Sequence, residues 1–140
     1  MFRAPDAPIY SSAVLETARL SGHWVQVATF AEGDAPCAGG SADLSAGDAE
    51  MSWDLCLGDG QTAGSGPMQM PKPGRFAVPG MADWWVLWAD ADYRTMVIGT
   101  PGGQFGFVLN RTDNLPSDRL KAVRDIFQFN GYNTEKLVFF

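Results

Sequence analysis

The sequence is poor in the residues that most catalytic and metal sites require. Its 140 residues include one histidine, His23, and two cysteines, Cys37 and Cys56. One imidazole and two thiols cannot complete a tetrahedral zinc site without further ligands. No serine or cysteine is set up as a nucleophile beside His23, and no two carboxylates have a spacing that suggests acid and base roles. We therefore expect no metal, no cofactor and no catalytic residue, and predict that the protein is not an enzyme.

Basic residues are also scarce. Lys and Arg number 10 against 16 Asp and Glu, a formal net charge of -6, so the chain lacks the positive field that attracts nucleic acid. No apolar run reaches the 18 or so residues of a membrane-spanning helix. Because residues 1–6 show no apolar leader, either the protein is cytosolic or a secretory leader has been removed.

Apolar and aromatic residues are plentiful by contrast. They make up 46% of the chain, with five Trp and nine Phe, which is more aromatic surface than a 15.1 kDa core usually needs. Part of that surface is therefore available to face a ligand. The length suits one domain, residues 1–140, with residues 1–11 as an extended N-terminal tether.

The two cysteines fit a disulfide across a hairpin. If residues 38–46 and 49–58 pair around a turn at 46–48, opposed residues have numbers that sum to about 94, and 37 plus 56 is 93. A bridge implies an oxidising compartment such as a periplasm. The alternative is a pair of free buried thiols in a cytosolic protein.

Short β segments follow one another along most of the chain. Residues 50–57 alternate apolar and polar side chains, as a half-buried strand does. Residues 12–20 predict one or two helical turns, and the Gly-rich stretch 58–66 predicts a loop. The predicted β segments are 23–30, 38–46, 50–57, 68–70, 75–78, 84–89, 95–100 and 105–111.

One amphipathic helix follows these segments. It is expected to begin with Ser117 as its N-cap, to end before Gly131, and to cover the apolar outer side of strand 84–89. A last strand, 136–140, adds to a sheet edge within the monomer or across a dimer. The pattern predicts an all-β fold: an eight-stranded antiparallel up-and-down barrel with one C-terminal α-helix packed on its side.

Two stretches resemble the lipocalin family. Residues 20–30 contain its Gly-x-Trp motif as Gly22-His23-Trp24. Residues 92–137 are similar in order and spacing to bacterial and apolipoprotein-D-like lipocalins, with Arg111 closing the last barrel strand. The resemblance implies that Trp24 plugs the closed end of the barrel, that Arg111 lies across its indole, and that Gly22 lets the incoming turn pass close beneath.

Large, soft or aromatic side chains on the strands are the candidate ligand contacts. Their alternative role is to fill a small core. Because neighbouring side chains alternate, Trp84, Trp85 and Trp88 cannot all face inward. Arg75, and after it Lys72, are the candidate cations for a carboxylate or phosphate at the barrel mouth. The predicted contacts are Met51, Trp53, Met68, Met70, Arg75, Phe76, Trp84 and Trp88.

The resemblance implies a carrier of a fatty acid, a lysophospholipid or a similar amphiphile, in the periplasm or attached to the outer membrane through a lipidated N-terminus. One alternative is a tetrapyrrole or other pigment binder, although His23 would lie outside the barrel and could not ligate haem. Another is a barrel filled by its own side chains that acts as a structural or interaction module, with residues 136–140 at a homodimer seam.

Overall fold

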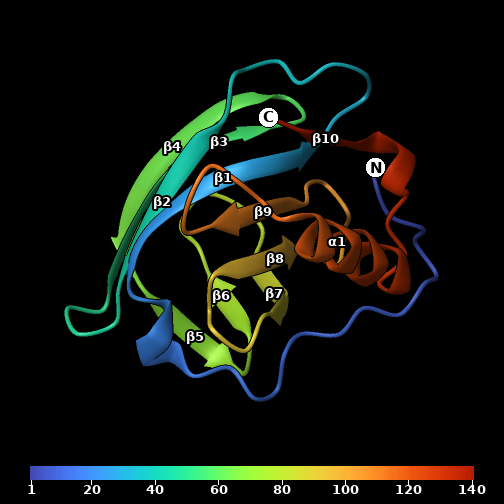
Figure 1. Cartoon of the computed structure of the whole chain (residues 1–140). Coiled ribbons are helices and arrows are strands. Elements are labelled where there is room, and N and C mark those ends of the chain that lie inside the picture. The colour runs from blue at the N-terminus through green and yellow to red at the C-terminus, as the bar shows by residue number, and fades with distance from the viewer.

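A single curled antiparallel sheet forms the body of the molecule in the computed structural model, which describes all 140 residues (Figure 1). The hydrogen-bonded order is β4-β3-β2-β1-β9-β8-β7-β6-β5, with β10 added to β1. The strands are β1 Gly22–Phe30, β2 Gly40–Ser45, β3 Glu50–Leu57, β4 Gly60–Pro67, β5 Gln69–Lys72, β6 Arg75–Ala77, β7 Trp84–Ala89, β8 Thr95–Gly99, β9 Phe107–Asn110 and β10 Leu137–Phe139.

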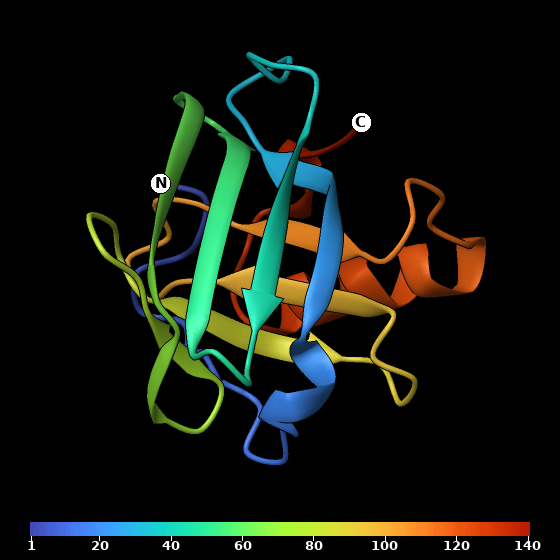
Figure 2. The same ribbon diagram turned by 90° about the vertical axis from the view of Figure 1, so that its left-hand side faces the viewer.

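The chain itself joins the two edges of the curled sheet. The first and last strands of this order, β4 and β5, are consecutive in the chain and are separated only by Met68. β4 pairs with β3, and β5 turns to pair with β6. With β4 and β5 counted as one bent strand, the predicted eight-stranded barrel is confirmed. Figure 2 shows β2, β3 and β4 as one curved wall facing the viewer.

The prediction of a loop at 58–66 was wrong, because these residues form the turn at 58–59 and then most of β4. Glycine and small polar residues are poor strand formers by propensity. Here they make room for a large side chain on the neighbouring strand, since a Cβ on Gly64 would lie 2.5 Å from Cζ2 of Trp53. Packing against β3 therefore overrides the local preference.

Two apolar layers hold the fold together. The first fills the barrel, with eighteen buried residues that include Trp24, Trp53 and Trp84. The second lies between the outer face of the barrel and its cover, and contains Val97 of β8 and Phe127 of the helix. The helix α1, Ser117–Phe129, begins one residue earlier than predicted, because Pro116 and not Ser117 is its N-cap. Figure 1 shows α1 lying alongside β7, β8 and β9.

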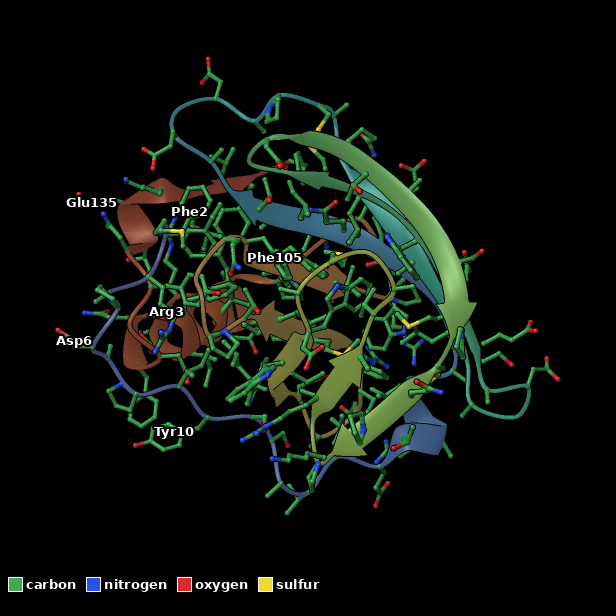
Figure 3. The ribbon with its side chains drawn as sticks, turned by 180° about the vertical axis from the view of Figure 1, so that it is seen from behind. Phe2, Arg3, Asp6, Tyr10, Phe105 and Glu135 are labelled. Atoms are coloured by element: carbon green, nitrogen blue, oxygen red, sulfur yellow. A yellow bond between two sulfur atoms is a disulfide. The ribbon has the colours of Figure 1, made fainter.

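The N-terminal segment, predicted as an extended tether over residues 1–11, packs in part as a component of the cover. Phe2 and Arg3 are buried, and the Arg3 guanidinium donates to the carbonyls of Asn130, Pro101 and Ala7. Figure 3 shows Phe2, Arg3 and Tyr10 along an irregular segment on the helix side of the barrel. The segment then leads into the 3-10 helix η1, Thr17–Leu20, of which Leu20 is buried.

The disulfide Cys37–Cys56 is present, with Cα atoms 5.7 Å apart, and it ties the β1–β2 loop to β3. The β2–β3 register, with Ser41 opposite Asp54, is one residue from the predicted one. The C-terminal strand β10 pairs with residues 28–30 of β1 in the same chain. A second short 3-10 helix, η2 Thr134–Lys136, leads into β10.

Gly40 is predicted to be essential for the start of β2. The carboxamide of Gln26 passes beside it to reach β3, accepting from the Cys56 N–H and donating to the Cys56 carbonyl, both at 2.7 Å. A Cβ on Gly40 would overlap the Asp54 carbonyl oxygen and the Gln26 side chain. We expect Gly40→Ala to lower the free energy of unfolding by about 1–3 kcal/mol, measured by urea denaturation.

The matched control for this substitution is Gly47→Ala in the β2–β3 turn, where a Cβ would meet nothing within 4 Å. We expect it to change the free energy of unfolding by less than about 0.5 kcal/mol. Equal effects of the two alanines would show that close packing at Gly40 does not govern this junction.

Candidate functional site

A hollow of about 250 Å³ lies at one end of the barrel. The opposite end is closed by η1 and Trp24, whose indole N–H donates to the Leu20 carbonyl at 2.8 Å. The hollow lies where the β3–β4 turn, the β6–β7 loop and the β8–β9 loop meet, and we call it the mouth. Its lining residues are Leu57, Asp59, Thr62, Gly80, Met81, Ala82, Gln104 and Phe105.

The floor of the mouth joins the buried core of the barrel. Leu57 and Phe105 belong to the core cluster, and Met81 and Ala82 pack against it. Below them Trp84 is the centre of an aromatic group, with the rings of Trp53, Phe76 and Phe107 at centroid distances of 5.9, 6.5 and 5.1 Å, all edge to face. The mouth thus has an apolar floor above an aromatic group, while its lining also includes Asp59, Thr62 and Gln104.

Tyr132 fixes the position of Phe105 from outside the barrel. Its hydroxyl donates to the Phe105 carbonyl at 2.6 Å and accepts from the Thr100 N–H at 2.9 Å. Burial raises the pKa of Tyr132 to about 12, so the hydroxyl keeps its proton and remains a donor at neutral pH. One wall of the mouth is therefore held by the cover layer.

Met81 lies between the mouth and Trp84. The fully buried indole N–H of Trp84 donates to the Met81 sulfur at 3.4 Å. A thioether is a weak acceptor, so this donor is only weakly satisfied. Movement of Met81 would expose Trp84 to the mouth.

Most of the predicted ligand contacts lie inside the barrel, where they pack against one another. Met51, Trp53, Met68, Phe76 and Trp84 all belong to the interior cluster. Met70 is partly buried at the edge of that cluster. These side chains fill the space between the closed end and the mouth.

Trp88 was placed incorrectly, because it lies on the outer face of the barrel. A β-bulge between Val86 and Trp88 inserts one extra residue into β7, which reverses the inward and outward alternation. Trp88 therefore stands opposite Val97, and both belong to the outer layer with Trp85. Trp84 is the one tryptophan of the three that faces inward.

Arg75 also does not reach the mouth. Its neighbour Phe76 points inward, so Arg75 points outward, where its guanidinium carbon lies 3.8 Å above the Trp85 ring and its Nε donates to Ser11. Lys72 is exposed at the end of β5, next to the β5–β6 turn. Neither cation is available to meet a ligand carboxylate inside the barrel.

The residues that sequence reasoning missed come from turns. Asp59, Met81, Ala82 and Gln104 have no periodicity that relates them to the core, so alternation of side chains could not select them. The only local signal is the Pro79-Gly80 turn just before Met81, which marks a loop at the end of a strand.

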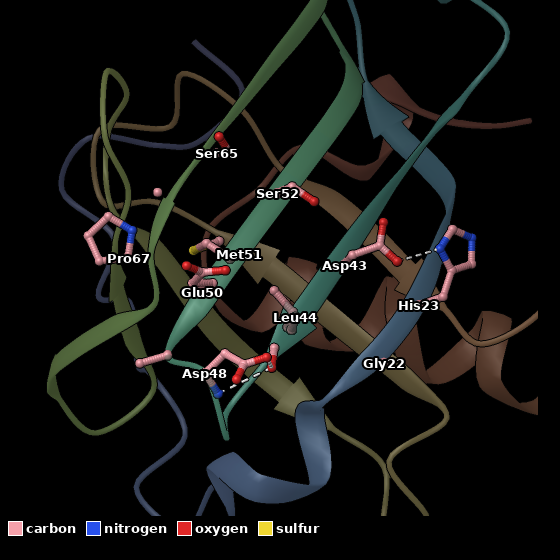
Figure 4. Close-up of a pocket in the computed structure, with 13 residues that line it drawn as sticks. Gly22, His23, Asp43, Leu44, Asp48, Glu50, Met51, Ser52, Ser65 and Pro67 are labelled. Carbon is pink, nitrogen blue, oxygen red and sulfur yellow. Dashed lines mark hydrogen bonds and ion pairs between the residues drawn. The ribbon is translucent and has the colours of Figure 1, made fainter.

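A second hollow, of about 700 Å³, lies on the outer surface of β1–β4 (Figure 4). His23 lies there, hydrogen-bonded to Asp43 at 2.8 Å, and across the strands Asp43 stands opposite Ser52. The serine is thus next to the carboxylate and not next to the imidazole, which is not the order of a nucleophile and its base. No three His, Cys, Asp or Glu side chains form a metal-binding group.

The fold and the mouth define a class of protein, the small antiparallel barrel that is closed at one end and has a hollow at the other. A family model described as "Lipocalin-like domain" matches residues 60–140, and the chain belongs to that family. The resemblance to the lipocalin family is thereby confirmed. None of its helices has the length and apolar character to cross a membrane.

Known proteins with related sequence or structure are lipocalins or share their fold. Temperature-induced lipocalin-1 of Arabidopsis thaliana is 32% identical over 60 residues, which is 43% of this chain and only 32% of that protein. The siderocalin Ex-FABP, described as having dual ligand specificities, superimposes with a TM-score of 0.60 at 17% identity, covering 85% of this chain and 91% of its own. Lobster apocrustacyanin A1 superimposes with a TM-score of 0.56 at 17% identity, covering 95% of this chain and 88% of its own.

Proposed function

We propose that this protein binds and carries a small hydrophobic or amphiphilic ligand at the mouth. The observation that carries the proposal is the mouth over the Trp84 aromatic group, where the core side chains of Leu57 and Phe105 line a hollow. Its volume is below the roughly 300–1,000 Å³ of ordinary ligand sites. The site therefore suits a short chain or one end of a longer molecule, such as a medium-length fatty acid or lysophospholipid.

Methionine gives the mouth room to adapt. Met81 lines it, and Met68 and Met51 lie in the interior cluster below. Unbranched thioether side chains change conformation at low cost, which suits irregular apolar ligands. Binding would then proceed by displacement of Met81 and not by entry into a preformed cavity.

Ala82→Trp is expected to block the site. Ala82 is half-buried in the lining, and an indole there would fill most of the mouth. Titration with 1-octanol, octanoate and an eight-carbon lysophosphatidylcholine, followed by native mass spectrometry, should show a 1:1 complex for the wild type and at least a tenfold loss of affinity, about 1.4 kcal/mol, for the variant.

The control is Ala63→Trp, the same change on the exposed outer side of β4. It should bind like the wild type. Loss of binding in both variants, or in neither, would contradict the assignment of the site to the mouth.

A structural or interaction module is the second candidate function. The observation that favours it is the filled interior, in which Trp24, Phe76, Trp84 and Phe107 are all fully buried. Under this alternative no amphiphile binds the wild type in the same titration. A pigment ligand is less well supported, because flat rings need more space than the mouth provides and His23 lies on the outer surface.

We also propose that the protein works in an oxidising compartment such as a periplasm. The Cys37–Cys56 disulfide supports this location, since such bonds persist mainly outside the cytosol. Attachment to the outer membrane through a lipidated N-terminus is compatible with the 75% exposure of Met1 next to the docked Phe2. Thiol labelling of the native protein in each cell fraction tests the compartment.

A further inference from the structure

The hydrogen-bond donor beneath the mouth lacks a strong acceptor. Trp84 is fully buried, and its indole N–H has only the Met81 sulfur, at 3.4 Å, as its partner. At the closed end, by contrast, the Trp24 indole donates to a carbonyl oxygen at 2.8 Å. A buried donor gains free energy when an oxygen replaces a thioether as its acceptor.

Met81 can leave this position. It lies in the loop between β6 and β7, where Gly80 has a φ of +78°. The backbone N–H of Met81 reaches only the Val78 carbonyl, at 3.4 Å, which is long for an amide hydrogen bond. Its side chain is half-buried and already lines the mouth. A ligand entering the mouth therefore meets Met81 first and the Trp84 N–H directly behind it.

The charges around the mouth disfavour an anion. Asp59 is the one charged residue of the lining, and no Lys or Arg occurs between Arg19 and Lys72. Arg3 packs against the β8–β9 loop, yet each of its three guanidinium nitrogens donates to a backbone carbonyl, of Asn130, Pro101 or Ala7. A carboxylate placed next to Trp84 would lose hydration, would find no cation and would face Asp59.

We propose that the mouth selects a neutral ligand with one acceptor oxygen, such as a ketone, ester or alcohol, which accepts from the Trp84 N–H in place of Met81. The inference rests on the proposed function and narrows its ligand class. It argues against an ionised fatty acid bound head first. The Trp84 N–H donor, the acceptor oxygen of the ligand and the negative charge of Asp59 together define the selectivity for a neutral ligand.

A matched series of eight-carbon ligands tests this selectivity. The affinities of 2-octanone, octane and octanoate for the wild-type protein are compared at pH 7.5 by NMR titration. We expect 2-octanone to bind about three- to tenfold more tightly than octane, because of one added hydrogen bond, and at least about tenfold more tightly than octanoate. The Trp84 indole N–H resonance should shift downfield only with the ketone.

Two variants test the contributions of Asp59 and Met81 to this selectivity separately. Asp59→Asn should raise octanoate affinity about two- to fivefold and so narrow the difference between the octanoate and 2-octanone affinities, because Asp59 is exposed and partly screened. Met81→Leu, similar in volume, should shift the Trp84 indole resonance upfield in the free protein. With 2-octanone bound, the resonance should return to the position seen in the wild-type complex.

The outcomes are distinguishable from failure of the proposed function. If no member of the series binds, the carrier proposal itself fails, and this inference with it. If octanoate binds as tightly as 2-octanone, or if ligands bind while the Trp84 indole resonance stays unchanged, the mouth is a ligand site without the proposed selectivity and the inference is overturned.

Discussion

Trp24→Ala is expected to lower the free energy of unfolding by about 3–5 kcal/mol, measured by urea denaturation and far-UV circular dichroism. The Trp24 side chain is fully buried at the closed end of the barrel. Arg111 lies 3.7 Å above its ring, and the guanidinium donates to the carbonyls of Arg19, Ser21, His23 and Tyr93. Loss of the indole therefore leaves a cavity and removes the surface on which Arg111 rests.

Trp88→Ala is the matched control for this substitution. Trp88 is only half-buried, on the outer face of β7, so the same deletion should cost clearly less than at Trp24. Arg111→Lys tests the residue that packs on the Trp24 ring. Lysine keeps the positive charge but lacks the planar guanidinium that donates to the surrounding carbonyls. If Trp24→Ala were no more destabilising than Trp88→Ala, the closed end would not be the anchor of the barrel.

Removal of the disulfide should lower the free energy of unfolding by about 3 kcal/mol. Cys37 and Cys56 are 19 residues apart in sequence, and their bond restricts the unfolded chain. In the folded state it holds the β1–β2 loop next to the Gln26–Cys56 hydrogen bonds. The double variant Cys37→Ser/Cys56→Ser, compared with wild type by urea denaturation, measures the effect.

Reductant provides the control for the disulfide. It should destabilise the wild type to the level of the double serine variant and leave that variant unchanged. A wild type that is equally stable with and without reductant would show that the bond contributes nothing to the folded state.

Much of the fold follows from local sequence. The alternation in residues 50–57 predicted β3. Counting residues across the β2–β3 hairpin placed Cys37 near Cys56, and the two are bonded although the register differs by one residue from the predicted one. The Gly22-His23-Trp24 motif located the closed end. The Gly-rich stretch before Pro67 was missed as a strand, since its pairing depends on the neighbouring Trp53 and not on its own propensity.

The candidate site was less predictable. One inserted residue, Leu87, turned Trp88 outward, and nothing in the sequence of β7 marks that bulge. The N-terminal segment packs over β7, where Ser11 accepts from Arg75, a contact between residues 64 positions apart. Met81 and Asp59 lie in turns, so only the three-dimensional arrangement brings them together. The sequence predicted most of the interior candidates correctly, but it did not predict which residues line the mouth.

The most direct test of the carrier account is an NMR titration of the six methionine methyl groups with 2-octanone. Met81 lines the mouth, Met51, Met68 and Met96 belong to the interior cluster, and Met1 is 75% exposed. The account predicts a saturable shift that is largest at Met81, smaller in the interior and absent at Met1. If no methyl group shifts saturably, the barrel is a filled module and the mouth is not a ligand site.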